Sequence, residues 1–320
     1  MRLFKLALLF FIFFSFLLNG KEINLTETSN QFSVTSKSLS EFNFVNFLSK
    51  INTKKVVRGS KEYLKLFVNS YGYNAKPGSA ELPVLEELII IPFGAEASIN
   101  ILNQEEEIIA LSDYELENLI FPSQPSISKS VDAEQVPFYF NEEYYSRNNF
   151  NETDLVKIEL LGKMRGQQLA RLSVSPFKYN PTTNELKITT KIEVKINFKN
   201  IDIVEHKLNQ QKYYSTEFDH LFKRCLNYIP LQKKDIITTY PVKYVIVADS
   251  DFQTALQPLI DWKTRKGFVV IEAYTDDPLV GSSNDSIHSF LKDMYDNATA
   301  SNPAPTYLLI VGDDAQVPSF

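Results

Sequence analysis

The sequence predicts two folded parts of different architecture: an antiparallel β-sandwich, followed by an incomplete α/β unit built on a parallel sheet. The first part is indicated by a long alternation of apolar and polar residues and by short apolar runs between Pro and Gly breaks. The second is indicated by a strand–helix–strand–helix–strand order after Asp235. With 320 residues, 44% of them hydrophobic and 22% charged, the chain can form two cores.

Composition excludes several classes of function. The formal net charge is −6, which argues against a nucleic-acid binder, because such a protein usually presents a basic face. Cys225 is the only cysteine, so an internal disulfide and a cysteine-based metal site are both excluded. Three scattered histidines leave little room for a histidine-rich metal site. We therefore expect neither a metal nor a cofactor.

Residues 1–20 have the features of a signal peptide. Arg2 and Lys5 give a basic start, and an apolar run extends from Leu6 to Phe14. This apolar core is short for a membrane span, and Gly20 suits the position before a cleavage site. A permanent N-terminal anchor is the competing interpretation. We expect export to the medium or the cell surface, with no membrane association after cleavage.

The strongest strand signal is the alternation from Glu185 to Phe198, which predicts a strand with one buried face. Asn180–Asn184 forms a predicted turn before it, because Pro181 fixes φ and Asn184 tolerates left-handed geometry. Gln168–Val174, ahead of this turn, is predicted to be the partner strand of a hairpin. Further short strands are expected at 88–91, 98–101 and 156–160. On these residues alone, a carbohydrate- or protein-binding module remains an open alternative.

The second part begins with a nearly continuous apolar strand, which is typical of a buried parallel strand. Pro258 lies within the following helical pattern, so the regular helix is predicted to begin there and to stop at Gly267. The expected strands are Lys243–Asp249, Phe268–Tyr274 and Thr306–Asp313. A second helix is expected at Ile287–Tyr295. Doubly wound sheets have about five or six strands, so this unit is expected to be truncated.

Residue chemistry alone provides no complete active site. Cys225 is predicted to be a packing residue, because it shares a helical face with apolar neighbours and His220 does not align with it. His206 is expected at the surface, and His288 is expected to be a solvated helix residue. Asp249 and the pair Asp313-Asp314 follow parallel strands, where open α/β sheets place ligands. A site role and simple capping of the next loop both remain open for these acids.

Two series of motifs resemble one known family. The second part carries Lys243–Val247, Leu259–Gly267, Tyr307–Asp313 and Val317-Pro318. The first part carries Leu82–Leu85, Phe121–Pro125, Val136–Tyr139, Arg165-Gly166, Tyr179–Pro181 and Phe218–Tyr228. In this order, over roughly residues 80 to 320, they resemble the gingipain-type cysteine endopeptidases of family C25. These are secreted bacterial proteases with a caspase-like fold, made with an N-terminal propeptide.

The resemblance implies a signal peptide at 1–20, a β-sandwich propeptide at 21–234, and the start of a caspase-like domain at 235–320. It implies a zymogen whose propeptide packs on its own protease domain and whose full-length parent cleaves proteins or peptides by thiolate attack. The family's catalytic His precedes Gly and its catalytic Cys follows Ala. This chain contains neither arrangement, so both groups are expected beyond it. The alternatives are a non-enzymatic binding or adhesion protein and a sortase-like secretion protein.

Two pairs of basic residues are candidates for regulation of such a zymogen. Arg165, with Lys163 close by, matches the family's Arg-Gly position and is the candidate for an inhibitory contact; a solvated loop charge is the alternative. Lys233 and Lys234 are the only basic residues of Pro230–Tyr240, a stretch without strand or helix period. Exposed linkers favour proteolysis, so we predict maturation after one of these lysines. A linker that is never cut is the alternative.

Overall fold

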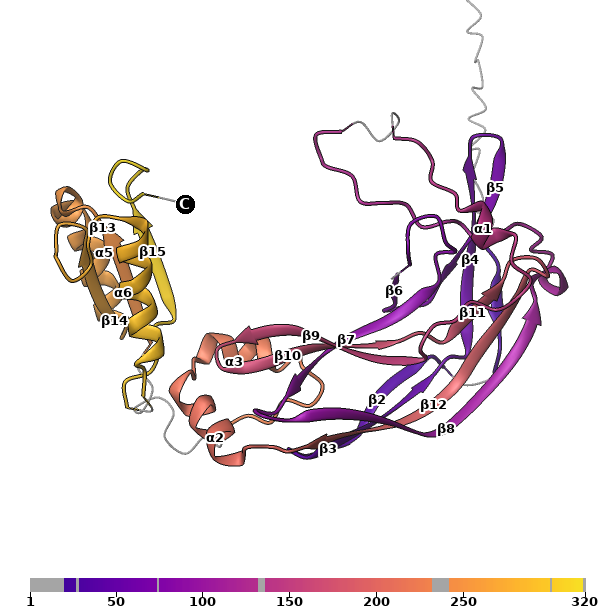
Figure 1. The fold of residues 1–320 in the computed structure, drawn as a ribbon, viewed down its shortest axis with the longest axis horizontal. Coiled ribbons are helices and arrows are strands. Elements are labelled where there is room, and N and C mark those ends of the chain that lie inside the picture. The colour runs from indigo at the N-terminus through magenta and orange to yellow at the C-terminus, as the bar shows by residue number, and fades with distance from the viewer. Residues whose placement is uncertain are drawn as a thin grey trace, which may run out of the picture.

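The computed structural model describes residues 20–26, 29–73, 75–131, 136–231, 242–299 and 301–318. Most of the predicted signal peptide and both candidate processing lysines, Lys233 and Lys234, lie outside the described residues. The chain forms a strand-rich first part and a smaller α/β second part, which is orange to yellow in Figure 1. In the described residues, no helix is both long enough and apolar enough to cross a membrane.

Antiparallel strands dominate the first part. They are β1 (Glu22–Asn24), β2 (Gln31–Lys37), β3 (Glu41–Phe47), β4 (Lys50–Arg58), β5 (Lys61–Phe67), β6 (Gly72–Tyr73), β7 (Pro83–Ile91), β8 (Glu96–Ala110), β9 (Val156–Met164), β10 (Gln167–Val174), β11 (Phe177–Asn180) and β12 (Glu185–Lys199). Its helices are the 3₁₀ turn η1 (Leu111–Tyr114), α1 (Glu142–Tyr145), α2 (Ile203–Lys212) and α3 (Thr216–Phe222). The β-sandwich prediction for this part is confirmed.

Two sheets form the sandwich, with strand orders β6-β7-β10-β9 and β11-β12-β3-β2, and β8 adds to the second sheet by pairing with β12. The core between them joins residues such as Leu85, Ile89 and Leu172 of the first sheet to Phe44 and Val194 of the second. A further sheet, β1-β4-β5, extends the core at the end far from α2 (Figure 1). Alternate side chains of β12 are buried, as its sequence pattern predicts.

The predicted hairpin partner of the long strand is wrong. β10 pairs with β7 and β9, whereas the hairpin partner of β12 is the short strand β11. The chain changes sheet between these strands, at Ser175-Pro176. As a result Leu172 and Val174 of β10 face Val194 of β12 across the core instead of pairing with that strand. The turn predicted at Asn180–Asn184 does connect β11 to β12, and Asn184 has a positive φ of 53°.

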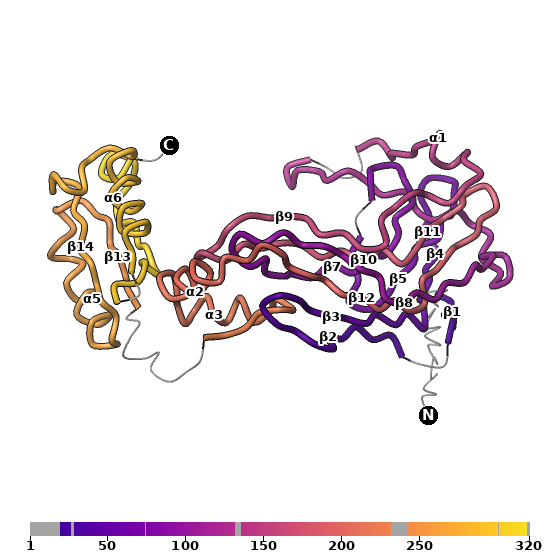
Figure 2. Tube along the Cα trace, turned by 60° about the horizontal axis from the view of Figure 1, so that its bottom comes forward, coloured from indigo at the N-terminus to yellow at the C-terminus, as the bar shows by residue number. Residues whose placement is uncertain are grey.

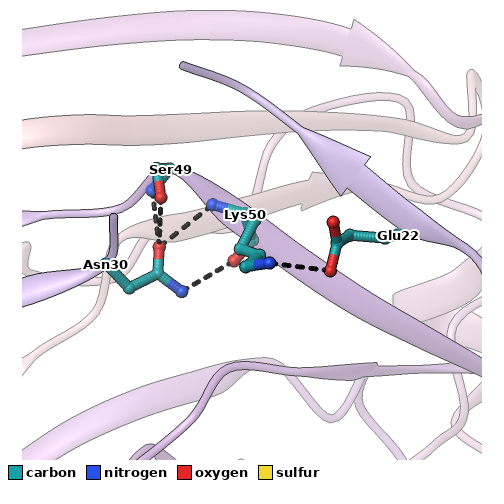
Figure 3. A network of polar contacts seen from close by, with 4 residues as sticks. All are labelled: Glu22, Asn30, Ser49 and Lys50. Carbon is teal, nitrogen blue, oxygen red and sulfur yellow. Dashed lines mark hydrogen bonds and ion pairs between the residues drawn. The ribbon is translucent and has the colours of Figure 1, made fainter. Parts of the chain in front are cut away.

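A similar change of sheet separates β3 from β4, and Asn30 holds it in place (Figure 3). Its side-chain oxygen accepts hydrogen bonds from the Ser49 amide (2.6 Å), the Ser49 hydroxyl (3.0 Å) and the Lys50 amide (3.0 Å). Its amide group donates to the Lys50 carbonyl at 2.9 Å. The Lys50 ammonium contacts Glu22 of β1 at 2.9 Å. One side chain thus satisfies the backbone groups that the corner removes from a β-ladder.

The second part contains a parallel sheet of order β14-β13-β15, with helices on both faces. Its elements are β13 (Lys243–Ala248), η2 (Ser250–Phe252), α5 (Gln253–Arg265), β14 (Val269–Tyr274), α6 (Asn284–Asp296) and β15 (Tyr307–Val311). The predicted start of α5 at Pro258 is wrong, because the helix begins at Gln253 and contains this proline. Pro258 is exposed, so water can solvate the carbonyl that its missing N–H leaves unbonded, while Leu256 and Ile260 stay buried.

Candidate functional site at the seam between the two parts

The two parts meet along a seam, which we define by Arg165 and Lys212–Glu217 on the first part and by Tyr295-Asp296 and Ala304–Tyr307 on the second. The Ala304 amide donates to the Lys212 carbonyl at 3.2 Å, and the hydroxyls of Thr306 and Ser215 are 3.2 Å apart. In both overall views, α2 and α3 lie at the end of the sandwich that faces the second part (Figures 1 and 2). The seam therefore joins backbone to backbone as well as side chain to side chain.

Arg165 reaches the seam from a tight turn. It is the first residue of the two-residue turn between β9 and β10, with φ of 50°, and Gly166 follows with φ of 72°. Positive φ at both positions is the signature of a type I′ hairpin turn. A Cβ on Gly166 would lie 2.5 Å from the Tyr213 ring, so only glycine fits there without displacing that ring.

The guanidinium group of Arg165 is buried and donates hydrogen bonds to backbone carbonyl oxygens. The residue is 7% exposed. Its Nε donates to the Tyr213 carbonyl at 3.0 Å, and Nη2 lies 3.3 Å from the carbonyls of Tyr214 and Ala304. Nη1 donates to the Pro305 carbonyl. Burial lowers the pKa of Arg165 below its ordinary value, while the neighbouring Tyr295 and Tyr213 act in the opposite direction. Arginine stays charged in proteins, so these dipoles balance a full positive charge.

Aromatic rings enclose the same group. The guanidinium carbon of Arg165 lies 5.2 Å from the centre of the Phe218 ring and 5.8 Å from that of Tyr295. Tyr295 in turn stacks on Tyr213, with ring centres 4.8 Å apart and an interplanar angle of 23°. Beside this stack, the Lys212 ammonium donates to the Asp296 carbonyl at 2.5 Å, at the C-terminal end of α6. A cation is favourable there because the helix dipole leaves partial negative charge.

Among the other predicted regulatory residues, only Lys163 is described by the structure, and it does not contact the seam. Lys163 is exposed, and its ammonium lies 5.6 Å from the centre of the Phe93 ring in its own part. Lys233 and Lys234 lie outside the described residues. Sequence reasoning missed Tyr213, Tyr295 and the carbonyls that receive Arg165. The only signal for them is the Arg-Gly pair, because a backbone carbonyl has no sequence signature.

In the described residues, the buried thiol of Cys225 and the histidines do not form a catalytic arrangement. Cys225 is 3% exposed, packs on Ile90, Phe222 and Tyr228, and has its pKa raised to about 11 by burial, which confirms its packing role. His206 was expected at the surface, and this is wrong. It is 7% exposed, and its Nδ1 accepts a hydrogen bond of 3.4 Å from the Phe93 amide.

The acids at the carboxyl ends of the strands hold their own loops. The Asp249 carboxylate accepts from the Asp251 amide at 2.9 Å, and the Asp313 carboxylate accepts from the Ala315 amide at 2.9 Å. These bonds favour the capping alternative for both residues. Within the described part of the chain, no cluster of three or more His, Cys, Asp or Glu side chains is arranged to hold a metal ion.

Comparison with known proteins assigns both parts of the chain to protein families. The family model of the C25 propeptide matches residues 35–215, and that of peptidase family C25 matches 237–320. Lys-gingipain of Porphyromonas gingivalis is 32% identical over 298 residues, covering 91% of this chain but only 17% of the relative. Gingipain R1 of the same species is 23% identical over 250 residues, covering 77% of this chain and 24% of the relative. The chain thus spans a small fraction of these proteins.

Solved structures also resemble this chain. One, on the zymogenic latency of P. gingivalis gingipain K, has a TM-score of 0.54 at 29% identity and covers 57% of this chain and 99% of the other. A complex of P. gingivalis RgpB pro- and mature domains has a TM-score of 0.50 at 17% identity and covers 62% and 98%, which shows the fold alone. The chain belongs to the gingipain-type cysteine peptidases of family C25, as a C25 propeptide followed by part of a C25 peptidase domain.

Proposed function

We propose that this chain is the leading portion of a secreted cysteine-endopeptidase zymogen, with a propeptide at 21–234 and part of the protease domain at 235–320. The observation that carries the proposal is the seam, in which Arg165 and Lys212 of the propeptide bond to backbone carbonyls of the second part. The existence of a complex between RgpB pro- and mature domains supports the same arrangement. The apolar leader supports a secreted or cell-surface location.

The full-length parent would hydrolyse protein or peptide substrates by thiolate attack on the scissile carbonyl. We place its catalytic His and Cys outside residues 1–320. The reason is that Cys225 follows Arg224 and is buried with a raised pKa, whereas a nucleophilic thiol needs exposure and a lowered pKa. The non-enzymatic alternative is not favoured, because the peptidase model matches the second part.

For latency, we assign the inhibitory role to the β9–β10 hairpin, with Arg165 as its main contact and Lys163 as a neighbouring charge. Arg165 faces the carbonyl oxygens of Ala304 and Pro305 in the second part, so it would act by holding the propeptide in place rather than by filling an acidic pocket. For maturation, we propose a cut after Lys233 or Lys234, between the last described propeptide residue, Leu231, and β13.

The test uses the full-length precursor in which this chain is followed by the rest of its reading frame. We expect no peptidase activity before the cut, activity afterwards, and a new N-terminus between 232 and 242 by mass spectrometry. Cys225→Ala should mature and cleave peptides as the parent does. Loss of activity in a well-folded Cys225→Ala protein would contradict the assignment, and a mature enzyme with its N-terminus inside β13 would exclude the proposed cut.

A further inference from the structure

We propose that the carbonyls of Ala304 and Pro305, together with the ring of Tyr295, form a guanidinium-binding site on the second part of the chain. Arg165 fills this site here. The inference rests on the proposed function only in treating the two parts as propeptide and protease domain. The ligand class is an alkylguanidinium, and an arginine side chain of a protein segment is the ligand the site would take if Arg165 were absent.

The acceptors of the site suit a planar group with several donors. Nη1 and Nη2 of Arg165 point to two successive carbonyls of the second part, while Nε and Nη2 satisfy carbonyls of Tyr213 and Tyr214. A guanidinium group carries five N–H donors in a fixed fork, whereas an ammonium group has three donors around one atom. A lysine ammonium could not span this arc of oxygens, so the site distinguishes the two cations by shape.

The rings add a second preference for a flat cation. Arg165 is enclosed between Phe218 of its own part and Tyr295 of the other. Guanidinium groups stack on aromatic faces and are more weakly hydrated than ammonium groups, so they lose less on burial. Tyr295 is held in place by its stack on Tyr213, which means that the site is formed by packing and not by the ligand alone.

The electrostatic field of the site comes from dipoles. Among the salt bridges of the described residues, none involves Arg165. Tyr295 belongs to the last turn of α6, a helix of 13 residues whose dipole leaves partial negative charge at this end. Removing Arg165 therefore leaves carbonyl oxygens without donors in a buried place, which is unfavourable and creates the affinity for a replacement cation.

Chemical rescue tests the proposal in the full chain. We expect Arg165→Ala to lower the midpoint of thermal unfolding, and millimolar propylguanidinium to restore part of that loss by a saturable shift of a few degrees. Propylammonium at the same concentration should give no such shift. Wild-type protein should gain nothing from either compound, since Arg165 occupies the site. Arg171→Ala is the matched control, because this arginine is half-exposed and paired with Glu86 and Glu159.

Each outcome of this experiment either supports or contradicts the proposed guanidinium-binding site. Equal stabilisation by both cations, or by neither, would overturn the site, and so would an Arg165→Ala midpoint equal to that of wild type. If Arg165→Ala does not fold, Arg165→Lys replaces it: the proposal requires a lowered midpoint, and a wild-type midpoint refutes it. Tyr295→Ala should abolish rescue in the Arg165→Ala background. Peptidase activity of the full-length precursor is a separate measurement, so failure of rescue and failure of the proposed function are distinguishable.

Discussion

Asn227 replaces a missing strand at the edge of β7, and its removal offers a direct test of how the end of the propeptide is held. Its side-chain oxygen accepts from the Ile90 amide at 2.8 Å, and its side-chain nitrogen donates to the Ile90 carbonyl at 2.7 Å. The neighbouring Leu226 amide donates to the Leu88 carbonyl at 2.9 Å. On this side β6 pairs only with Pro83 and Val84, so residues 226–227 provide partners that no strand supplies.

Asn227→Ala deletes both side-chain bonds and leaves a buried N–H and a buried C=O at Ile90. Each unsatisfied buried group costs about 1–3 kcal/mol, so we expect a loss of about 3 kcal/mol in the free energy of unfolding. For a domain of this size, that corresponds to a fall of about 6–12 °C in the midpoint. Asn118→Ala is the control, since it removes one exposed bond of 3.3 Å and should change stability by less than about 0.5 kcal/mol.

The assay is urea unfolding followed by far-ultraviolet circular dichroism. Tryptophan fluorescence is unsuitable for this domain, because the only tryptophan, Trp262, lies in α5 of the second part. The midpoint concentration should fall without a change of slope, because the folded state remains equally compact. A loss below about 1 kcal/mol, or one no larger than that of Asn118→Ala, would refute the idea that this carboxamide acts as a strand surrogate.

Two further predictions follow from buried titratable groups. Burial lowers the pKa of His206 from 6.5, so its contribution to stability is complete above pH 6.5 and is lost as the pH falls through its folded pKa. Replacement by Gln (His206→Gln) should reduce this acid dependence of the free energy of unfolding, and an unchanged dependence would contradict the prediction. Burial raises the pKa of Cys225 from 9.0 to about 11, so its contribution is complete below pH 9.0 and is lost as the pH rises toward about 11. Its reaction with a disulfide reagent should be slow in native protein and fast in urea, and equal rates would contradict its burial.

The sequence predicts those parts of the fold in which the pattern of apolar and polar residues reflects a single local environment. The strand at 185–199 alternates over most of its length because one face lies on a core and the other carries ion pairs such as Lys187 with Glu106. The central parallel strand β13 reads as an apolar run because helices cover both of its faces. By contrast, β4 and β5 have irregular burial, so a period of two does not identify them. The pairing of β12 with β3 and β8 depends on points where the chain crosses from one sheet to another. The periodicity of the sequence does not encode these crossings.

The candidate site was only partly predictable, and the reason is visible at the β9–β10 turn. A type I′ turn favours Asn or Gly at its first position, because these residues tolerate positive φ; arginine is unfavourable there. Local preference and the observed residue therefore disagree at Arg165, which adopts φ of 50°. The disagreement is resolved by tertiary contacts, since four carbonyls and two rings receive its guanidinium group. The sequence thus points to the arginine, while its partners, being backbone atoms brought from 213–214 and 304–305, become evident only in the folded chain.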